Sequence, residues 1–328
     1  MNDTQILSEM SGLERFIFSL RALYGKSGYR QYQMSKFEEY DLYARYRDFL
    51  ASEQIISFTD TDGKLRALKP DVTLSLIKNL PDRPYDQQKL YYDERVYRVS
   101  TGSGRFQELR QLGLECIGAV DDDALSKILK LACLSLQQIE ALETNGVSKK
   151  EAVLELSQID ILRGLFDALG LTYSQWDRLL PVIQSKNLSG LRQLLSEFVP
   201  APDARELEAS ELLQRMVAAP GAPQTMLTLL RSGASLVDQT RVDQLSGLID
   251  SMPEALRSMI RIDFSLTGNS RYYNGIIFQG YVQGVPQRVL AGGQYDRMME
   301  RMGRRSKACG FALYLNLLER MFEGKRGA

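Results

Sequence analysis

The stretch that decides the fold runs from Tyr91 to Gly118 and reads YYDERVYRVSTGSGRFQELRQLGLECIG. It predicts two strands joined by a loop, with the returning strand over residues 110–117. Side chains alternate between the two faces of a strand. Gln111 and Glu115 therefore point to one face, and the apolar residues between them point to the other.

Charged side chains on the two strands can share one wall of a cleft. Arg98 and Arg105 flank the loop tip at residues 101–104, and Gln111 and Glu115 follow on the returning strand. This set predicts an anion site beside an ammonium site. An isolated hairpin with these charges would be interpreted as an ordinary surface element, so the rest of the chain has to decide.

Three further segments occur with this hairpin in an order that resembles a known family. The hairpin is similar to motif 2 of the class II aminoacyl-tRNA synthetases in its histidyl version, through Arg98, residues 104–106, Gln111 and Glu115. The other three similar segments are LKPDVT at 68–73, SRYYNGIIF at 270–278 and AGGQYD at 291–296. Together the four matches span roughly residues 28–320, which makes the resemblance far more specific than any one of them.

The resemblance implies the fold. We expect an α+β class II synthetase-like domain over residues 1–328, with a mainly antiparallel sheet flanked by helices. A leucine-rich helical pattern at about 157–256 predicts a mainly helical insertion in that domain. Only seven residues follow Met321, so no anticodon-binding domain is expected.

The resemblance also implies a histidine-binding pocket. Asp71 would pair with the ammonium group, Arg98 or Arg105 with the carboxylate, and Glu115 with an imidazole N–H. The alternative is an inherited polar network that only stabilises the fold. The full set of candidate histidine-binding residues is Asp71, Thr73, Arg98, Arg105, Gln111, Glu115, Tyr272, Tyr273 and Tyr295.

Three positions depart from the family pattern at the ATP site. Ser100 stands where the family has a glutamate that helps hold adenine, and Gly268 stands where it has a catalytic arginine. Leu317 replaces the arginine that ends the third class II motif. Losing positioned cations removes a large electrostatic contribution to catalysis, so we expect no catalytic residues.

A retained amino-acid pocket with a lost ATP site resembles the regulatory subunits of ATP phosphoribosyltransferase, which are paralogues of the synthetase. That resemblance implies a hetero-oligomer with the short-form catalytic subunit, and feedback by histidine in the first step of histidine biosynthesis. It also implies a homodimer, because motif 1 is a dimer element in the family. Two alternatives stay open: a truncated ligase that activates an amino acid for a non-tRNA acceptor, and a scaffold with a vestigial pocket.

Composition is consistent with these expectations. Lys+Arg and Asp+Glu are both 41, so no basic surplus favours tRNA binding. The chain has no histidine, which excludes His-based general bases and His-ligated zinc, and its three cysteines form no metal pattern. We expect no metal, no cofactor and no membrane contact. Without a signal peptide or a spanning segment, a cytoplasmic location is expected.

Local patterns predict four further elements. An amphipathic helix is expected at residues 4–25, a hairpin around the turn at 60–63, and a strand at 152–156. Residues 121–123 are three aspartates that suit the start of a helix reaching about residue 142. Capping explains these acids better than metal binding does.

Overall fold

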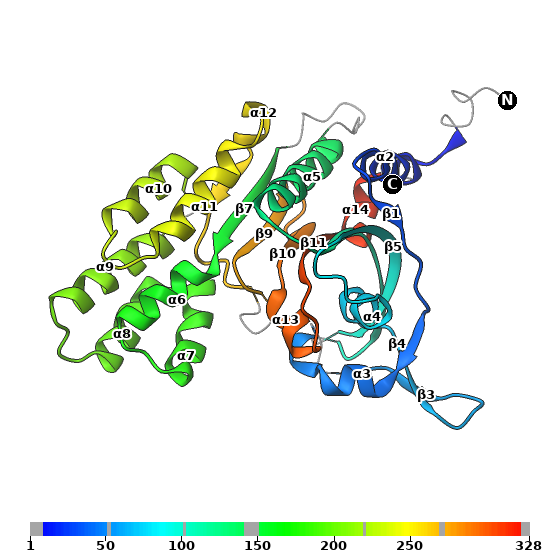
Figure 1. Cartoon of the computed structure of the whole chain (residues 1–328), viewed down its shortest axis with the longest axis horizontal. Coiled ribbons are helices and arrows are strands. Elements are labelled where there is room, and N and C mark those ends of the chain that lie inside the picture. The colour runs from blue at the N-terminus through cyan, green and yellow to red at the C-terminus, as the bar shows by residue number, and fades with distance from the viewer. Residues whose placement is uncertain are drawn as a thin grey trace.

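A central eight-stranded sheet organises the part of the chain that the structure describes (Figure 1). This computed structural model describes residues 9–50, 54–100, 103–140, 151–218, 221–268 and 273–322. The strand order is β1-β5-β6-β11-β10-β9-β7-β8. The strands are β1 (Arg30–Gln31), β5 (Gln87–Val99), β6 (Phe106–Gly118), β7 (Ala152–Gln158), β8 (Ile260–Ile262), β9 (Ile276–Val282), β10 (Leu290–Gln294) and β11 (Lys307–Tyr314).

Most neighbouring strands of this sheet are antiparallel. Only β1 with β5 and β7 with β8 run parallel among the described strands. The other five pairs are antiparallel. The predicted α+β fold with a mainly antiparallel sheet is therefore confirmed.

The deciding hairpin forms the longest strand pair. β5 and β6 stay in register from Gln87↔Gly118 to Val99↔Phe106. The returning strand thus begins four residues earlier than the sequence pattern predicts. Because the ladder continues to Phe106, Arg105 lies in the turn rather than on the strand.

A second, three-stranded sheet lies beside the main one. It contains β2 (Phe37–Glu39), β4 (Leu65–Leu68) and β3 (Ser57–Thr59), in that order. β3 and β4 form the predicted hairpin, and Gly63 in its turn has a φ of 80°, which favours glycine.

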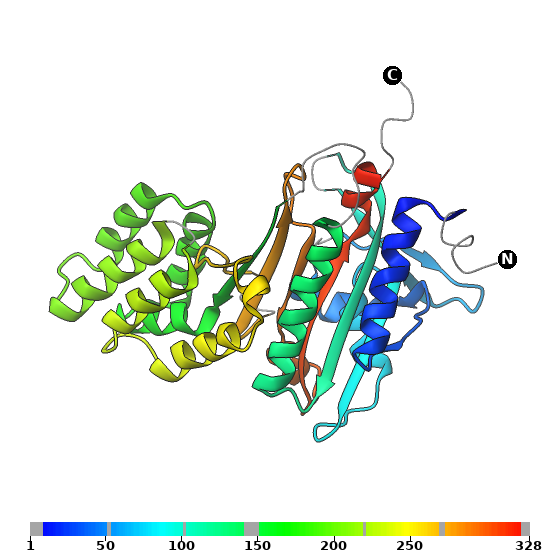
Figure 2. The ribbon, with the colours of Figure 1, turned by 90° about the horizontal axis from the view of Figure 1, so that it is seen from above.

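Three helices cover one face of the main sheet. They are α2 (Gly12–Lys26), α5 (Asp122–Glu140) and α14 (Leu315–Phe322). Figure 2 shows α5 lying along the sheet with α2 beside it. Leu112, Leu114 and Cys116 of β6 are buried in the apolar core that these helices share with the sheet.

The ends of these helices follow from local sequence. Ser11 caps α2 in a capping box with Glu14, so this helix begins at Gly12, and the predicted start at Thr4 lies outside the described residues. At the start of α5, Asp121 Oδ1 accepts a hydrogen bond from the backbone N–H of Ala124 at 2.9 Å. Asp121 therefore caps the helix, as predicted, and Asp122 and Asp123 lie in its first turn.

A helical lobe follows β7 and returns to the sheet at β8 (Figure 1). Within the lobe, Gly221 forms an isolated antiparallel bridge with Ile262 of β8. The helices of the lobe are α6 (Ile159–Ala168), α7 (Tyr173–Gln184), α8 (Leu188–Phe198), α9 (Ala204–Ala218), α10 (Pro223–Ser232), α11 (Gln239–Asp250) and α12 (Glu254–Arg257).

A separate apolar cluster forms on the second face of the sheet. Short helices contribute to it: α3 (Tyr40–Arg45), the 3₁₀ turn η1 (Arg47–Phe49), α4 (Val72–Asn79) and α13 (Asp296–Arg301). None of the helices in the described ranges combines the length and the apolar character needed to cross a membrane.

Candidate functional site

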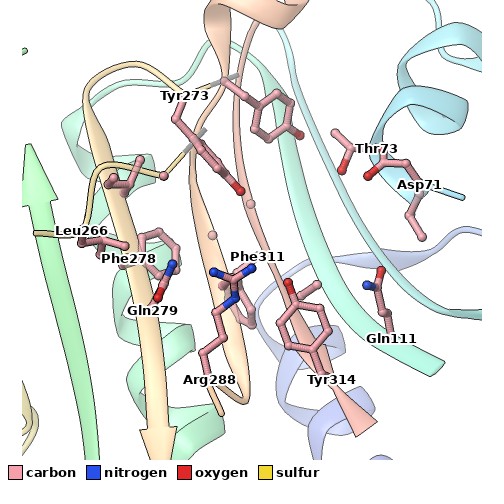
Figure 3. Close-up of a pocket in the computed structure, with 18 of the residues that line it drawn as sticks. Asp71, Thr73, Gln111, Leu266, Tyr273, Phe278, Gln279, Arg288, Phe311 and Tyr314 are labelled. Carbon is pink, nitrogen blue, oxygen red and sulfur yellow. The ribbon is translucent and has the colours of Figure 1, made fainter. Parts of the chain in front are cut away.

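A cavity of about 600 Å³ opens on the second face of the main sheet (Figure 3). Gln111 and Glu115 of β6 both line it, whereas Leu112 and Leu114 are buried in the core on the opposite face. The alternation predicted for the returning strand is confirmed. Strands β9, β10 and β11 continue the floor, and α4 and the segment before β9 form walls.

Three small residues lie side by side at the floor of the cavity. Gly113, Ala312 and Ala291 lie in register across β6, β11 and β10. A Cβ on Gly113 would lie 2.4 Å from the hydroxyl of Tyr92, whose ring crosses this position. A larger side chain at residue 113 would displace the Tyr92 ring, which itself lines the cavity.

The closest contact in the floor is between Gly310 and Glu115. These residues are directly opposite each other in the antiparallel β6–β11 pair. A Cβ on Gly310 would lie 1.8 Å from Glu115 Oε2, a separation that real Cβ atoms do not show. The carboxyl can occupy its position only because residue 310 is glycine.

Glu115 is 3% exposed and accepts two hydrogen bonds from hydroxyl groups. Tyr295 donates to Oε2 at 2.6 Å, and Thr73 donates to Oε1 at 3.2 Å. Burial raises the pKa of the Glu115 carboxyl to about 8, although these two hydrogen bonds favour the charged form. The nearby carboxylate of Asp71 raises the pKa further.

Asp71 provides a second acid at the same end of the cavity. Its Oδ1 accepts a hydrogen bond from the backbone N–H of Leu74 at 2.9 Å, which caps α4. Burial raises the pKa of Asp71, while this hydrogen bond and the positive charge of Arg98 oppose the rise. Arg98 is itself oriented by Pro70, whose carbonyl accepts from Nε at 2.9 Å.

The two acids and their hydroxyl partners define what this end of the cavity can bind. Carboxyl groups that are buried and not ion-paired favour a ligand that supplies an N–H donor or a positive charge. No cluster of three or more potential metal ligands occurs among the described residues. The arrangement therefore suits an ammonium or imidazole group.

Comparison with known proteins places the chain in a family. The family model described as histidyl-tRNA synthetase matches residues 6–318. The chain belongs to the histidyl-tRNA synthetase family. The resemblance inferred from the four motifs is thus confirmed.

Similar curated relatives carry the name ATP phosphoribosyltransferase regulatory subunit. The one from Acetivibrio thermocellus is 24% identical over 91% of this chain and 70% of its own length. The one from Lactococcus lactis subsp. cremoris is 25% identical over 94% of this chain and 92% of its own length.

Solved structures share the fold. An ATP phosphoribosyltransferase regulatory subunit/histidyl-tRNA synthetase from Bacillus halodurans gives a TM-score of 0.74 at 21% identity, covering 95% of this chain and 79% of that chain. A chain of the ATP phosphoribosyl transferase (HisG:HisZ) complex from Thermotoga maritima gives a TM-score of 0.69 at 19% identity. That match covers 91% of this chain and 96% of the other.

Seven of the nine candidate histidine-binding residues line the cavity. These are Asp71, Thr73, Arg98, Gln111, Glu115, Tyr273 and Tyr295. Arg105 is exposed in the β5–β6 turn and does not line it. Tyr272 lies outside the described residues.

The three positions that depart from the histidyl-tRNA synthetase pattern lie apart from one another. Gly268 lines the cavity with a φ of 58°, and a Cβ there would lie 3.1 Å from the ring of Tyr273. Ser100 is in the β5–β6 turn and Leu317 is on α14, and neither lines the cavity.

Several polar residues of the cavity were not predicted from the sequence. They are Tyr92, Glu155, Gln184, Thr267, Gln279, Tyr281, Arg288 and Tyr314. Alternation from Ile277 along β9 could have indicated Gln279. No sequence pattern indicates Arg288, because its direction depends on the loop between β9 and β10.

The helical lobe also touches the cavity wall. Gln184 at the end of α7 donates from Nε2 to Thr267 Oγ1 at 2.7 Å. Two residues later, Lys186 forms an ion pair with Asp263 at 2.7 Å. The lobe is therefore held directly to the segment that carries Gly268.

Proposed function

We propose that this chain is a non-catalytic regulatory subunit of ATP phosphoribosyltransferase. It binds the short catalytic subunit, activates it and conveys histidine feedback in the first step of histidine biosynthesis. The observation that carries the proposal is a cavity whose acidic end is intact. In the same chain, Ser100, Gly268 and Leu317 stand at the positions that the family pattern gives to ATP-binding residues.

The intact end of the cavity supports histidine as the ligand. Glu115 can accept a hydrogen bond from an imidazole N–H, and Asp71 can pair with an ammonium group. Tyr273 and Gln111 line the space between these acids and the rest of the cavity. Free histidine should bind with a Kd between micromolar and millimolar, or roughly 4–8 kcal/mol.

The relatives support the partner. They are named as regulatory subunits, and one structural neighbour comes from a complex described as HisG:HisZ. We extend the regulatory role and the catalytic partner to this chain. We also propose that the helical lobe at residues 157–256 is an inserted domain. We also propose a cytoplasmic location, because Cys116, Cys133 and Cys309 are all buried free thiols.

We further propose that the subunit forms a homodimer. The three-stranded sheet exposes Phe37, Phe58 and Leu65 at 52%, 36% and 48%, and the two phenylalanine rings pack 5.3 Å apart. Exposed apolar side chains that adjoin one another are typical of a protein interface.

The proposal is tested by mixing this protein with a short-form catalytic subunit. We expect co-elution on gel filtration, a higher rate of phosphoribosyl transfer, and histidine inhibition that the catalytic subunit alone lacks. Allostery requires the two proteins to make different contacts in two states, so the effect must depend on complex formation. If the proteins neither associate nor change each other's activity, the assignment is wrong.

The matched test concerns catalysis by the chain alone. We expect no histidine-dependent exchange between ATP and pyrophosphate and no charging of tRNA, because the positions for the ATP-binding cations hold glycine and leucine. Exchange without charging would favour the truncated-ligase alternative. Activation of the partner without any histidine binding would favour a scaffold with a vestigial pocket.

A further inference from the structure

Arg288 reaches into the cavity from the loop between β9 and β10. Figure 3 shows its guanidinium group between Gln279 and Tyr314, with the hydroxyl of Tyr273 pointing toward it. Arg288 makes no hydrogen bond or ion pair with any residue in the described ranges. A cation directed into a cavity without a counter-ion indicates a place for an anionic ligand group.

The groups around Arg288 favour an anion. The hydroxyls of Tyr273 and Tyr314 are hydrogen-bond donors, and burial, followed by the proximity of Tyr314, raises the pKa of Tyr273. The Tyr273 hydroxyl therefore keeps its proton, and both hydroxyls can donate a hydrogen bond to an acceptor.

The carboxyl group of Glu155 lines the cavity together with Arg288 and forms no ion pair with it. Asp263 does not line the cavity and is paired with Lys186 at 2.7 Å. Burial, followed by the charge of Asp263, raises the pKa of Glu155, and Lys186 opposes the rise. The positive charge of Arg288 is left for the ligand.

The position of Arg288 also complements the missing arginine at residue 268. Gly268 lines the same cavity, and even a Cβ there would be 3.1 Å from the Tyr273 ring. The cation that the family places at 268 is thus absent. Arg288 supplies one from a different element.

The cavity consequently has an acidic end and a basic end. Gly293, Gly310 and Glu115 lie in register across three strands. Arg288 lies in the loop two residues before β10. Its long side chain extends toward Tyr273 (Figure 3).

We propose that Arg288, with the hydroxyls of Tyr273 and Tyr314, binds the carboxylate of an amino acid whose imidazole and ammonium groups are held by Glu115 and Asp71. This inference rests on the proposed histidine pocket and extends it. It moves the carboxylate away from the two arginines that the sequence suggested. Arg98 is oriented by Pro70 beside Asp71, and Arg105 lies outside the cavity.

The test compares histidine with histidinol, in which a hydroxymethyl group replaces the carboxylate. Calorimetric titration should show that the wild-type chain binds histidine at least tenfold more tightly than histidinol. Arg288→Gln should lower the affinity for histidine about tenfold, equivalent to about 1.4 kcal/mol. Its affinity for histidinol should stay within about twofold of wild type, because that ligand carries no anion for Arg288 to bind.

Three measurements keep the test decisive. Arg205→Gln removes an exposed arginine on α9 of the helical lobe and should leave both affinities unchanged. Thermal unfolding of Arg288→Gln should match wild type, since the side chain is exposed and makes no internal bond. Titration of Arg98→Gln with histidine and histidinol tests the competing assignment, in which Arg98 binds the carboxylate.

If Arg288→Gln keeps the preference for histidine and Arg98→Gln loses it, the carboxylate is at Arg98 and the inference is overturned. If the wild-type chain binds no histidine at millimolar concentrations, both this inference and the proposed pocket fail. Activation of the catalytic subunit is measured without histidine, so the regulatory proposal can stand or fall separately.

Discussion

Replacing Glu115 with glutamine should make the folded protein more stable at alkaline pH. The carboxyl is 3% exposed, and burial raises its pKa from an ordinary 4.5 to about 8. Glutamine has nearly the same shape and never ionises. The substitution therefore removes the cost of a buried charge and retains most of the packing.

The direction of the pH effect follows from proton linkage. Because the folded-state pKa is higher than the unfolded-state pKa, the folded protein holds this proton when the unfolded chain has lost it. The contribution of Glu115 to stability is most favourable below pH 4.5 and falls by about 1.4 kcal/mol per pH unit as the pH rises toward 8. At pH 8 the cost of Glu115 is about 4 kcal/mol.

The glutamine can replace most of the hydrogen bonding. Its carbonyl oxygen can accept from Tyr295, and its amide can donate to the hydroxyl of Thr73, which must then turn. Allowing about 1 kcal/mol for this rearrangement leaves a net gain of about 3 kcal/mol at pH 8. For a chain of 328 residues, that gain corresponds to a rise in Tm of about 4 °C.

The assay is thermal and urea unfolding of wild type and Glu115→Gln from pH 5.5 to pH 8.5. The two proteins should be nearly equal at the acid end and diverge as the pH rises. Glu211→Gln, at an exposed position of α9, is the matched control and should follow wild type throughout. Parallel curves for wild type and Glu115→Gln would refute the raised pKa and the argument built on it.

Two further predictions concern single positions in the fold. Gly310→Ala should lower the free energy of unfolding by about 3 kcal/mol and abolish histidine binding, because its Cβ would lie 1.8 Å from Glu115 Oε2. Gly247→Ala on α11 is the control: its Cβ would have no atom within 4 Å, and the substitution should stabilise the helix by about 1 kcal/mol. Lys69→Met should cost about 3 kcal/mol in urea unfolding, because Lys69 is fully buried and its 2.8 Å ion pair with Glu94 would lose one partner. An unchanged midpoint for Lys69→Met would show that the pair contributes nothing.

The sequence could predict the residues whose placement depends on local periodicity. Alternation placed Gln111 and Glu115 on one face, and the aspartate run marked the start of α5. Family motifs added Asp71 and Thr73, which are far from the hairpin in sequence. These predictions hold because strand alternation and helix capping are determined within a few residues.

Residues whose placement depends on register or turn geometry could not be predicted. Arg105 leaves the cavity because the β5–β6 ladder continues to Phe106 and puts it in the turn. Gly310 faces Glu115 because β11 and β6, nearly 200 residues apart in the chain, pair in one particular register. Arg288 enters the cavity from a loop that has no periodic pattern.

The cost of Glu115 itself supports a binding role. A buried carboxyl with a pKa of about 8 lowers the stability of the folded chain at neutral and alkaline pH, and glutamine or an apolar residue would avoid that cost. The same position also demands glycine at 310, which further restricts the strand that opposes it. A polar network kept only for stability would not require both a buried carboxyl at 115 and a glycine at 310. A ligand that donates an N–H or a positive charge to this carboxyl would offset the cost on binding, so the unfavourable energy of the empty cavity is recovered as affinity.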